Sequence, residues 1–191
     1  MNKKEDIFNC GKEIFISKGF KKTNVMEIAK SAGIGVGTFY NYYPSKEQLF
    51  LEIYVQENEK LKTSLIESLD FEQEPLQVVS QLIAKNIEAV NTNPILKEWY
   101  SQDFSKELEQ YYKQEGSKNL DSFRSLYTEL FRTWKAKGKI RDDIDEDLLP
   151  AFFDSLVYLD THKDEIGIQY FPRIIQYLAD FIMKGLTDHS K

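Results

Sequence analysis

The sequence predicts an all-α protein built of two parts, residues 1–46 and residues 47–191. Three observations support this prediction. Apolar residues recur three and four positions apart along most of the chain, which is the period of an amphipathic helix. Glycine, proline or capping residues separate these segments, as they separate helices. No segment shows the convincing apolar–polar alternation that is typical of a β-strand.

The two parts differ in charge. Residues 1–46 carry eight lysines and four acidic residues, a net charge of +4, whereas residues 47–191 carry 17 basic and 27 acidic residues, a net charge of −10. Salt screens exposed charges beyond about 10 Å, so the basic part can attract phosphates although the whole chain carries −6. This asymmetry is typical of a protein that binds nucleic acid at one end only.

The first helix is predicted over residues 4–18, with Ile7 and Phe15 on its apolar face and Gly19 at its end. Cys10 lies on this helix, and packing is favoured over a redox role because free cysteines are usually buried. A single cysteine excludes an internal disulfide and fits a reducing cytosol. The N-terminus lacks an apolar signal region and no apolar run reaches the length of a membrane span, so we expect a cytoplasmic protein.

Two short helices are predicted next. Asn24 and Glu27 have capping-box spacing at the start of the first, and Gly33 ends it. The second covers residues 36–43, because Pro44 disfavours helical geometry in the residue before it. Two helices joined by a turn of about four residues match the helix-turn-helix unit, whose second helix enters the DNA major groove.

The second of these helices is too short to be stable alone. Phe39 and Tyr43 lie four positions apart and can anchor it to the core. Gly35 and Gly37 leave the backbone nearly bare on another side, which suits close approach to a duplex.

A set of residues in this region matches a known sequence pattern in both residue type and spacing. The set is Ile7, Phe15, Gly19, Phe20, Thr23, Ile28, Ala29, Ala32, Gly33, Gly37, Thr38, Phe39, Tyr40, Tyr42, Tyr43, Ser45, Lys46 and Leu49. In these residues the sequence resembles the TetR family of bacterial transcriptional regulators. The resemblance covers residues 7–49, roughly a quarter of the chain. Elsewhere the chain resembles the family only in length and helical pattern.

The resemblance implies specific DNA contacts. It assigns Val36, Gly37 and Tyr40 to positions near base edges. It assigns Thr38, Asn41, Tyr42 and Lys46 to phosphates, with Thr23 or Asn24 at the start of the preceding helix and Gly35 at the cap of the second helix. Three residues depart from the family's pattern. Gly35 replaces a usual serine, Asn24 a usual threonine or serine, and Tyr43 a usual phenylalanine, and the first two departures affect individual phosphate contacts.

The second part reads as a series of helices. Ser45 and Gln48 form a capping box for a long helix that runs to about Leu69 and, at ~1.5 Å per residue, spans roughly 35 Å. The later helices are expected at residues 75–93, one or two within 95–114, 120–137, a helix from Asp145 or Asp147 through Leu159, and 172–186. No linker rich in glycine, serine or proline separates the two parts.

Nine aromatic residues lie between positions 99 and 134. Core packing is the favoured interpretation for the set, and a pocket for a flat or apolar effector is the alternative. The residues predicted for such a pocket are Trp99, Tyr100, Phe104, Phe123, Tyr127, Phe131 and Asp154. For the first three the two interpretations are equally balanced. Asp154 is flanked by apolar residues and could meet a cationic ligand.

The last two helices carry more apolar surface than a peripheral hairpin needs. In the TetR family this pair of helices forms a four-helix dimer interface. The predicted interface residues are Phe153, Leu156, Val157, Leu159, Ile175, Leu178, Phe181 and Ile182. Covering the monomer core is the less favoured alternative, since two-fold DNA sites call for a dimer.

The sequence gives little support for nucleotide binding, metal binding or catalysis. The glycine-rich run at residues 33–38 resembles a phosphate-binding loop but follows a helix rather than a strand. His162 and His189 are far apart and lack cysteine partners, so we expect neither a zinc site nor a catalytic base. We therefore expect no enzyme activity, no metal and no cofactor.

The resemblance and the charge pattern together predict a homodimeric transcriptional repressor. Residues 1–46 would form a helix-turn-helix domain for palindromic double-stranded operator DNA, and residues 47–191 a domain for dimerisation and a small-molecule effector. The alternative is a DNA-binding regulator of the same fold that is controlled by a protein partner or by no ligand.

Overall fold

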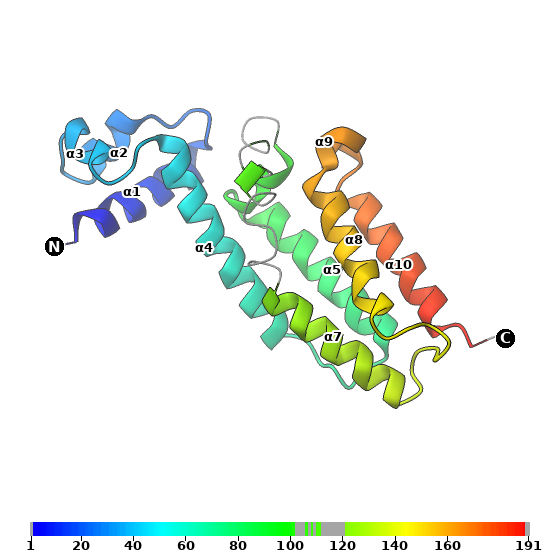
Figure 1. The fold of residues 1–191 in the computed structure, drawn as a ribbon. Helices are drawn as coiled ribbons and strands as arrows, with labels where there is room; N and C mark the ends of the chain where they lie inside the picture. The colour runs from blue at the N-terminus through cyan, green and yellow to red at the C-terminus, as the bar shows by residue number, and fades with distance from the viewer. Residues whose placement is uncertain (1, 102–105, 107, 109, 112–120, 190–191) are drawn as a thin grey trace. The chain divides into compact units, whose positions relative to one another are not determined.

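The computed structural model describes residues 2–101, 106, 108, 110–111 and 121–189. Within these ranges every regular element is a helix, which confirms the all-α fold class (Figure 1). The elements are α1 (Lys3–Lys18), α2 (Val25–Ser31), α3 (Val36–Tyr40), α4 (Lys46–Glu67), α5 (Pro75–Thr92), η1 (Leu96–Tyr100), α7 (Asp121–Ala136), α8 (Leu148–Thr161), α9 (Lys163–Ile166), η2 (Ile168–Tyr170) and α10 (Arg173–Thr187). No helix in the described part of the chain is long and apolar enough to cross a membrane.

One helix boundary differs from the expected one, the start of another is one of the two expected, and two short elements are additional. Helix α3 ends at Tyr40, and a turn follows in which the amide of Tyr42 bonds the carbonyl of Phe39 at 3.0 Å. Helix α8 begins at Leu148, which places Pro150 in its first turn, where a missing amide hydrogen costs nothing. The short elements α9 and η2 between α8 and α10 were not predicted.

The chain forms two compact units. One, called here the head unit, contains Met1–Ser64 and Glu88–Leu108, and the other, the body unit, contains Leu65–Ile87 and Glu109–Lys191. Helices α4 and α5 therefore each contribute residues to both units.

The core of the head unit joins α1 to the first turns of α4. The ring of Phe50 lies edge-on to Phe15 and Phe20, with centroids 4.9 and 5.1 Å apart. A Cβ atom at Gly11 would lie 2.7 Å from a methyl carbon of Leu49, so any larger residue there would require the Leu49 side chain to shift. All of these apolar side chains are buried.

The segment Glu88–Leu108 packs within the head unit through η1 and the end of α5. The indole of Trp99 stacks on Tyr54 of α4, with centroids 6.3 Å apart. Asn93 donates to Glu57 at 3.1 Å and accepts the amide of Ile95 at 2.9 Å, which caps the start of this segment. The head unit is thus larger than its DNA-binding helices.

The body unit has its own apolar core, to which α5, α7, α8 and α10 contribute. Trp134, Phe131, Leu149, Met183 and Ala179 are buried at its centre. Helix α8 packs against both α7 and α10 (Figure 1). Exposed apolar side chains remain on α8 and α10, and their placement is described below.

Candidate DNA-binding surface and effector pocket

The turn between α2 and α3 is built by local capping. The side chain of Asn24 accepts the amide of Glu27 at 3.0 Å and begins α2, as its spacing predicts. Gly33 has φ +67°, a left-handed conformation that favours glycine, and it ends the helix. Phe39 and Tyr43 are buried, so α3 is held to the core along one edge.

The opposite side of α3 is open to solvent. Asn24, Gly35, Val36, Gly37, Tyr40, Asn41 and Tyr42 are exposed, and Thr38 is half-buried. A Cβ atom built at Gly35 or Gly37 meets no atom within 4 Å, and neither glycine has a positive φ. Among the described residues, nothing therefore requires glycine at these two positions.

Two of the residues predicted to bind DNA have internal partners instead. Thr23 is 2% exposed, and its hydroxyl donates to the carbonyl of Gly19 at 2.8 Å. The ammonium of Lys46 donates to the carbonyls of Phe20 and Thr23, both at 3.0 Å, and lies 4.2 Å from the centre of the Phe20 ring. Lys46 thus clamps the loop between α1 and α2 onto the start of α4.

The Lys46 clamp leads to a prediction. Lys46→Met should lower the free energy of unfolding by about 1–3 kcal/mol, because two carbonyls lose a charged donor. Thermal denaturation measures this, and Lys30→Met, an exposed lysine on α2, is the matched control. An unchanged Tm with weaker DNA binding and a shallower salt dependence would instead assign Lys46 to a phosphate.

Tyr43 stands where the family usually has phenylalanine, and the structure accommodates its hydroxyl. The hydroxyl donates to Glu52 at 3.3 Å, and Glu52 also pairs with Lys4 at 2.9 Å. Burial and the neighbouring carboxylate of Glu52 raise the pKa of Tyr43. This departure therefore keeps the ring in the core and adds a polar contact at its rim.

The most exposed large apolar side chain of the described residues is not among the predicted DNA-binding residues. Met26, on the first turn of α2, is 71% exposed. Its position next to the cap residue Asn24 puts an apolar group beside the predicted phosphate contacts. Only its exposure identifies it, since a methionine in a helix normally predicts core.

A partly open apolar cavity of about 50 Å³ lies in the body unit between α5, α7 and α8. Two of the predicted effector residues, Tyr127 and Phe131, line it, together with Phe153 and Trp134. Tyr127 also hydrogen-bonds Asp154, which pairs with Arg124 at 3.2 Å. Burial and the bond to Asp154 raise the pKa of Tyr127, so the phenol remains a donor at neutral pH.

Trp99 and Tyr100 are not among the residues that line this cavity. Trp99 and Tyr100 belong to η1 in the head unit. Phe104 lies outside the described residues, and Phe123 falls on α7 with no described side chain. The predicted set therefore divides, and only Tyr127, Phe131 and Asp154 form a cluster.

Trp134 was predicted to pack in the core. In the structure it also carries a buried polar atom, its indole nitrogen. The side chain is 2% exposed, and its indole nitrogen has no hydrogen-bond partner among the described residues. A buried donor without an acceptor is unfavourable by about 1–3 kcal/mol. Since Trp134 also lines the cavity, a ligand carrying an acceptor could relieve this cost.

Comparison with known proteins adds to this geometry. Residues 7–53, which include the α2–turn–α3 unit and the capped start of α4, match the family described as bacterial regulatory proteins, tetR family. The DNA-binding region of this chain is thus that of the TetR family. The transcriptional repressor KstR2 of Mycolicibacterium smegmatis is 25% identical over 97% of this chain and 91% of its own length. The protein is accordingly a repressor-like transcriptional regulator and not an enzyme.

Solved structures agree on the fold of this TetR-family chain. RolR, in complex with resorcinol, has a TM-score of 0.63 and 17% identity, covering 98% of this chain and 89% of RolR. FadR of Thermus thermophilus, in complex with lauroyl-CoA, has a TM-score of 0.60 and 23% identity, covering 98% and 97%. At these identities the likeness concerns the fold alone.

The predicted dimer residues of this TetR-family protein lie mostly toward its own core. Leu156 is buried, and Phe153, Ile175, Leu178 and Ile182 pack against the core cluster, while Val157 and Leu159 are half-buried. Phe181, in contrast, is 62% exposed. The apolar side chains that α8 and α10 leave open are instead Leu148, Tyr158, Tyr177 and Phe181, here called the aromatic face.

A buried carboxylate connects α1, α4 and the end of α5 within the head unit. Glu57 accepts Lys12 at 2.8 Å, Lys60 at 3.1 Å and Asn93 at 3.1 Å, and its side chain is 12% exposed. Burial raises the pKa of Glu57, but the three donors outweigh it and lower the pKa below its ordinary value. The charged carboxylate therefore stabilises the folded head unit.

This junction predicts a dependence of stability on pH. Because the pKa of Glu57 is lowered on folding, its contribution is complete above the unfolded value of 4.5 and is lost as pH falls through the folded value. Glu57→Gln should be about 1 kcal/mol less stable than the wild type at pH 7 and should lose less stability on acidification. Urea unfolding at pH 7 and pH 3.5 measures both, and parallel losses in the two proteins would contradict the assignment.

Proposed function

We propose that the protein is a homodimeric repressor that binds palindromic double-stranded operator DNA in the cytoplasm and is released by a small-molecule effector. One observation carries the DNA-binding part. The exposed side of α3 presents Gly35 and Gly37, which no internal contact or backbone strain requires. Bare backbone at the surface of a helix-turn-helix unit permits the close approach that base-edge contacts need.

The composition of α3 and the turn after it favours sparse base readout. Residues 36–43 contain no arginine, lysine or glutamine, and Asn41 is the one side chain there of a type that bonds bases bidentately. Contacts of Val36 and Tyr40 with thymine methyl groups would then supply specificity, and lysines of the head unit would supply salt-dependent affinity.

Selection of binding sites from random DNA tests this proposal. We expect a palindrome whose half-site centres lie about one helical turn, or a small multiple of it, apart, with A·T pairs at the specified positions. Half-sites dominated by specified G·C pairs would contradict the proposed readout. Absence of any selected sequence would contradict the DNA-binding function itself.

The aromatic face supports dimerisation. Tyr158, Tyr177 and Phe181 are 61%, 53% and 62% exposed on two neighbouring helices. Large aromatic rings exposed in this way are unusual on a monomer and typical of interfaces. Pairing of this face with its copy would produce the two-fold symmetry that a palindromic site requires.

The cavity between α5, α7 and α8 is the proposed effector site. Its lining is aromatic and aliphatic, Tyr127 and Asp154 form a polar cluster at it, and Trp134 provides a donor without a partner among the described residues. The relatives RolR and FadR were solved with resorcinol and lauroyl-CoA, and these two molecules are suitable first probes. The small apolar cavity favours the first.

Fluorescence can test the effector site directly, because Trp99 and Trp134 are the protein's two tryptophans. In Trp99→Phe the emission reports on Trp134 alone. Resorcinol should change it, and operator DNA should weaken resorcinol binding by the same factor by which resorcinol weakens operator binding. Equal affinities with and without operator would exclude the switch.

The volume of the cavity favours a second candidate function, a regulator that does not respond to a small molecule. At about 50 Å³ it is smaller than the roughly 150 Å³ that an apolar cavity needs to hold benzene, so side chains must move before a ring can enter. A filled core is what a regulator controlled by a protein partner or by no ligand would have. If neither probe changes the Trp134 emission while operator binding is intact, this alternative takes precedence.

A further inference from the structure

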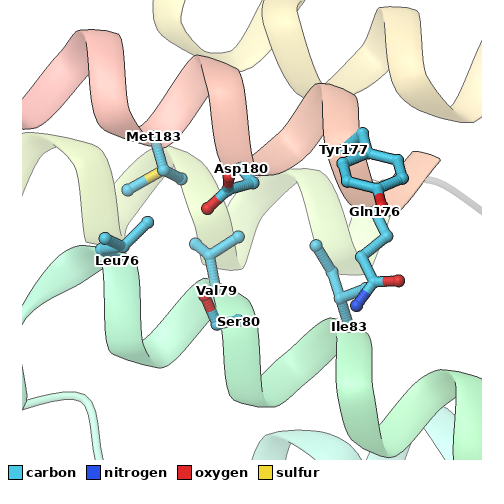
Figure 2. Close-up of a pocket in the computed structure, with 8 residues that line it drawn as sticks. All are labelled: Leu76, Val79, Ser80, Ile83, Gln176, Tyr177, Asp180 and Met183. Atoms are coloured by element: carbon cyan, nitrogen blue, oxygen red, sulfur yellow. The ribbon is translucent and has the colours of Figure 1, made fainter. Parts of the chain in front are cut away.

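A second hollow lies on the surface of the body unit, between α5 and α10. Figure 2 shows the residues that line it, with those of α5 facing those of α10. Its volume is about 210 Å³, four times that of the interior cavity. Leu76, Val79, Ile83 and Met183 give it an apolar floor, and Met183 is itself fully buried, so the hollow reaches the edge of the core. We call it the α5/α10 groove.

Polar groups from both helices also line the groove. Ser80 contributes a hydroxyl from α5, and Gln176, Tyr177 and Asp180 contribute an amide, a phenol and a carboxylate from α10. Tyr177, Asp180 and Met183 of α10 follow one another at three positions, and Gln176 lies four positions before Asp180, so they share one side of the helix. An apolar floor with a few convergent polar groups is the usual composition of a small-molecule site.

The carboxylate of Asp180 sets the charge of the groove. Its one ion pair in the described residues joins it to Lys184 at 2.8 Å, one turn further along α10. Lys184 is 61% exposed, and an exposed pair of this kind contributes little to stability. A cation bound in the groove can therefore replace the lysine on Asp180 at small cost.

We propose that the α5/α10 groove binds small amphiphilic organic cations, a primary or secondary amine carried on a ring or short apolar chain. The ammonium would donate to Asp180, and the apolar part would lie on Val79, Leu76 and Met183. The volume exceeds the roughly 150 Å³ that holds benzene and leaves room for a short side chain. The net charge of −10 on residues 47–191 attracts cations and repels carboxylates and phosphates.

One residue that lines the groove also belongs to the aromatic face. Tyr177 lines the groove and also stacks on Phe181, with ring centroids 6.3 Å apart. Both rings belong to the aromatic face. The groove shares Val79 with the wall of the cavity that contains Tyr127 and Trp134, but Asp180 and the other polar residues of the groove are not among the described residues that line that cavity, so the two sites can be tested separately.

Methionine methyl groups provide the test, because the chain has three methionines. In full-length protein labelled with ¹³C at the methionine methyl, Met183 reports on the groove and Met26, on α2, is an internal control. Titration with 2-phenylethylamine should shift the Met183 signal with a Kd on the order of millimolar, as expected for nine non-hydrogen atoms, and leave Met26 unchanged. The neutral 2-phenylethanol should bind at least about fivefold more weakly, and 3-phenylpropionate not measurably.

Two variants with opposite expected effects separate a specific site from structural damage. Asp180→Asn should weaken amine binding about tenfold or more and leave 2-phenylethanol unaffected, whereas Lys184→Ala should strengthen amine binding about two- to fivefold by removing the competing cation. Asp143→Asn, which neutralises a carboxylate paired with Arg141 elsewhere in the body unit, is the matched control and should bind as the wild type. Equal binding of amine and alcohol, an unmoved Met183 signal, or unchanged affinity in Asp180→Asn would each overturn the proposal.

Discussion

Gly37→Leu is expected to abolish specific operator binding while leaving the protein folded. A Cβ atom at this position has nothing within 4 Å among the described residues, and leucine is a better helix former than glycine. The fold should therefore be unchanged or stabilised by up to about 1 kcal/mol. On the duplex the same side chain would occupy the space of base-edge contacts, and losing two or three of them lowers the affinity at least about 100-fold.

A glycine elsewhere provides the matched control for this result. Gly185 of α10 is also helical, and its Cβ would likewise meet nothing within 4 Å. Gly185→Leu should gain similar stability and retain full operator affinity. Electrophoretic mobility shifts at one fixed salt concentration, together with thermal denaturation of both variants, measure the contrast. Wild-type operator affinity in Gly37→Leu would show that α3 does not enter the groove as proposed.

Phe181→Glu should convert the protein from a dimer to a monomer. Phe181 is 62% exposed in the single chain, so the change leaves the folded monomer intact, and in a paired aromatic face it would bury two carboxylates without partners. The dimer dissociation constant should rise at least about 100-fold. Operator affinity should fall with it, because two independent heads lose the effective concentration that a dimer provides.

Sedimentation velocity at micromolar concentration distinguishes the outcomes, and Ile16→Glu is the control. Ile16 is an apolar residue on α1 that is 44% exposed and lies far along the chain from the aromatic face. It should remain a dimer. A monomeric wild type would contradict the proposed assembly, and a dimeric Phe181→Glu would place the interface on another surface.

Local signals in the sequence were sufficient for the longer helices that the structure describes and for the caps of α2 and α4, although not for α9 and η2. Asn24 and Ser45 cap α2 and α4 as their spacing predicts, with amide bonds at 3.0 and 3.1 Å. Capping depends on residues within one turn of each other, and the sequence displays these directly. The same holds for Phe39 and Tyr43, whose spacing of four correctly identified the buried edge of α3.

Contacts between residues that are distant in the chain could not be predicted in this way. Lys46 bonds two backbone carbonyls more than 20 positions away, and backbone groups leave no mark in a sequence. Helix periodicity identified the apolar residues of α8 and α10 but not which of them face the protein's own core, so Leu156 was assigned to the interface and Tyr158 was not. The aromatic residues between positions 99 and 134 divide between two units for the same reason.

The tight fit of Gly11 against Leu49 determines where this protein could be recombined with its relatives. Exchange at residue 46, the expected domain boundary, would separate Gly11, Phe15 and Phe20 from the α4 side chains they were selected to fit. A chimera made there would pair one protein's glycine with another protein's bulkier or smaller side chain. Crossovers that keep the first turns of α4 with α1 preserve this match. DNA specificity can thus be transplanted only together with part of the helix that follows it.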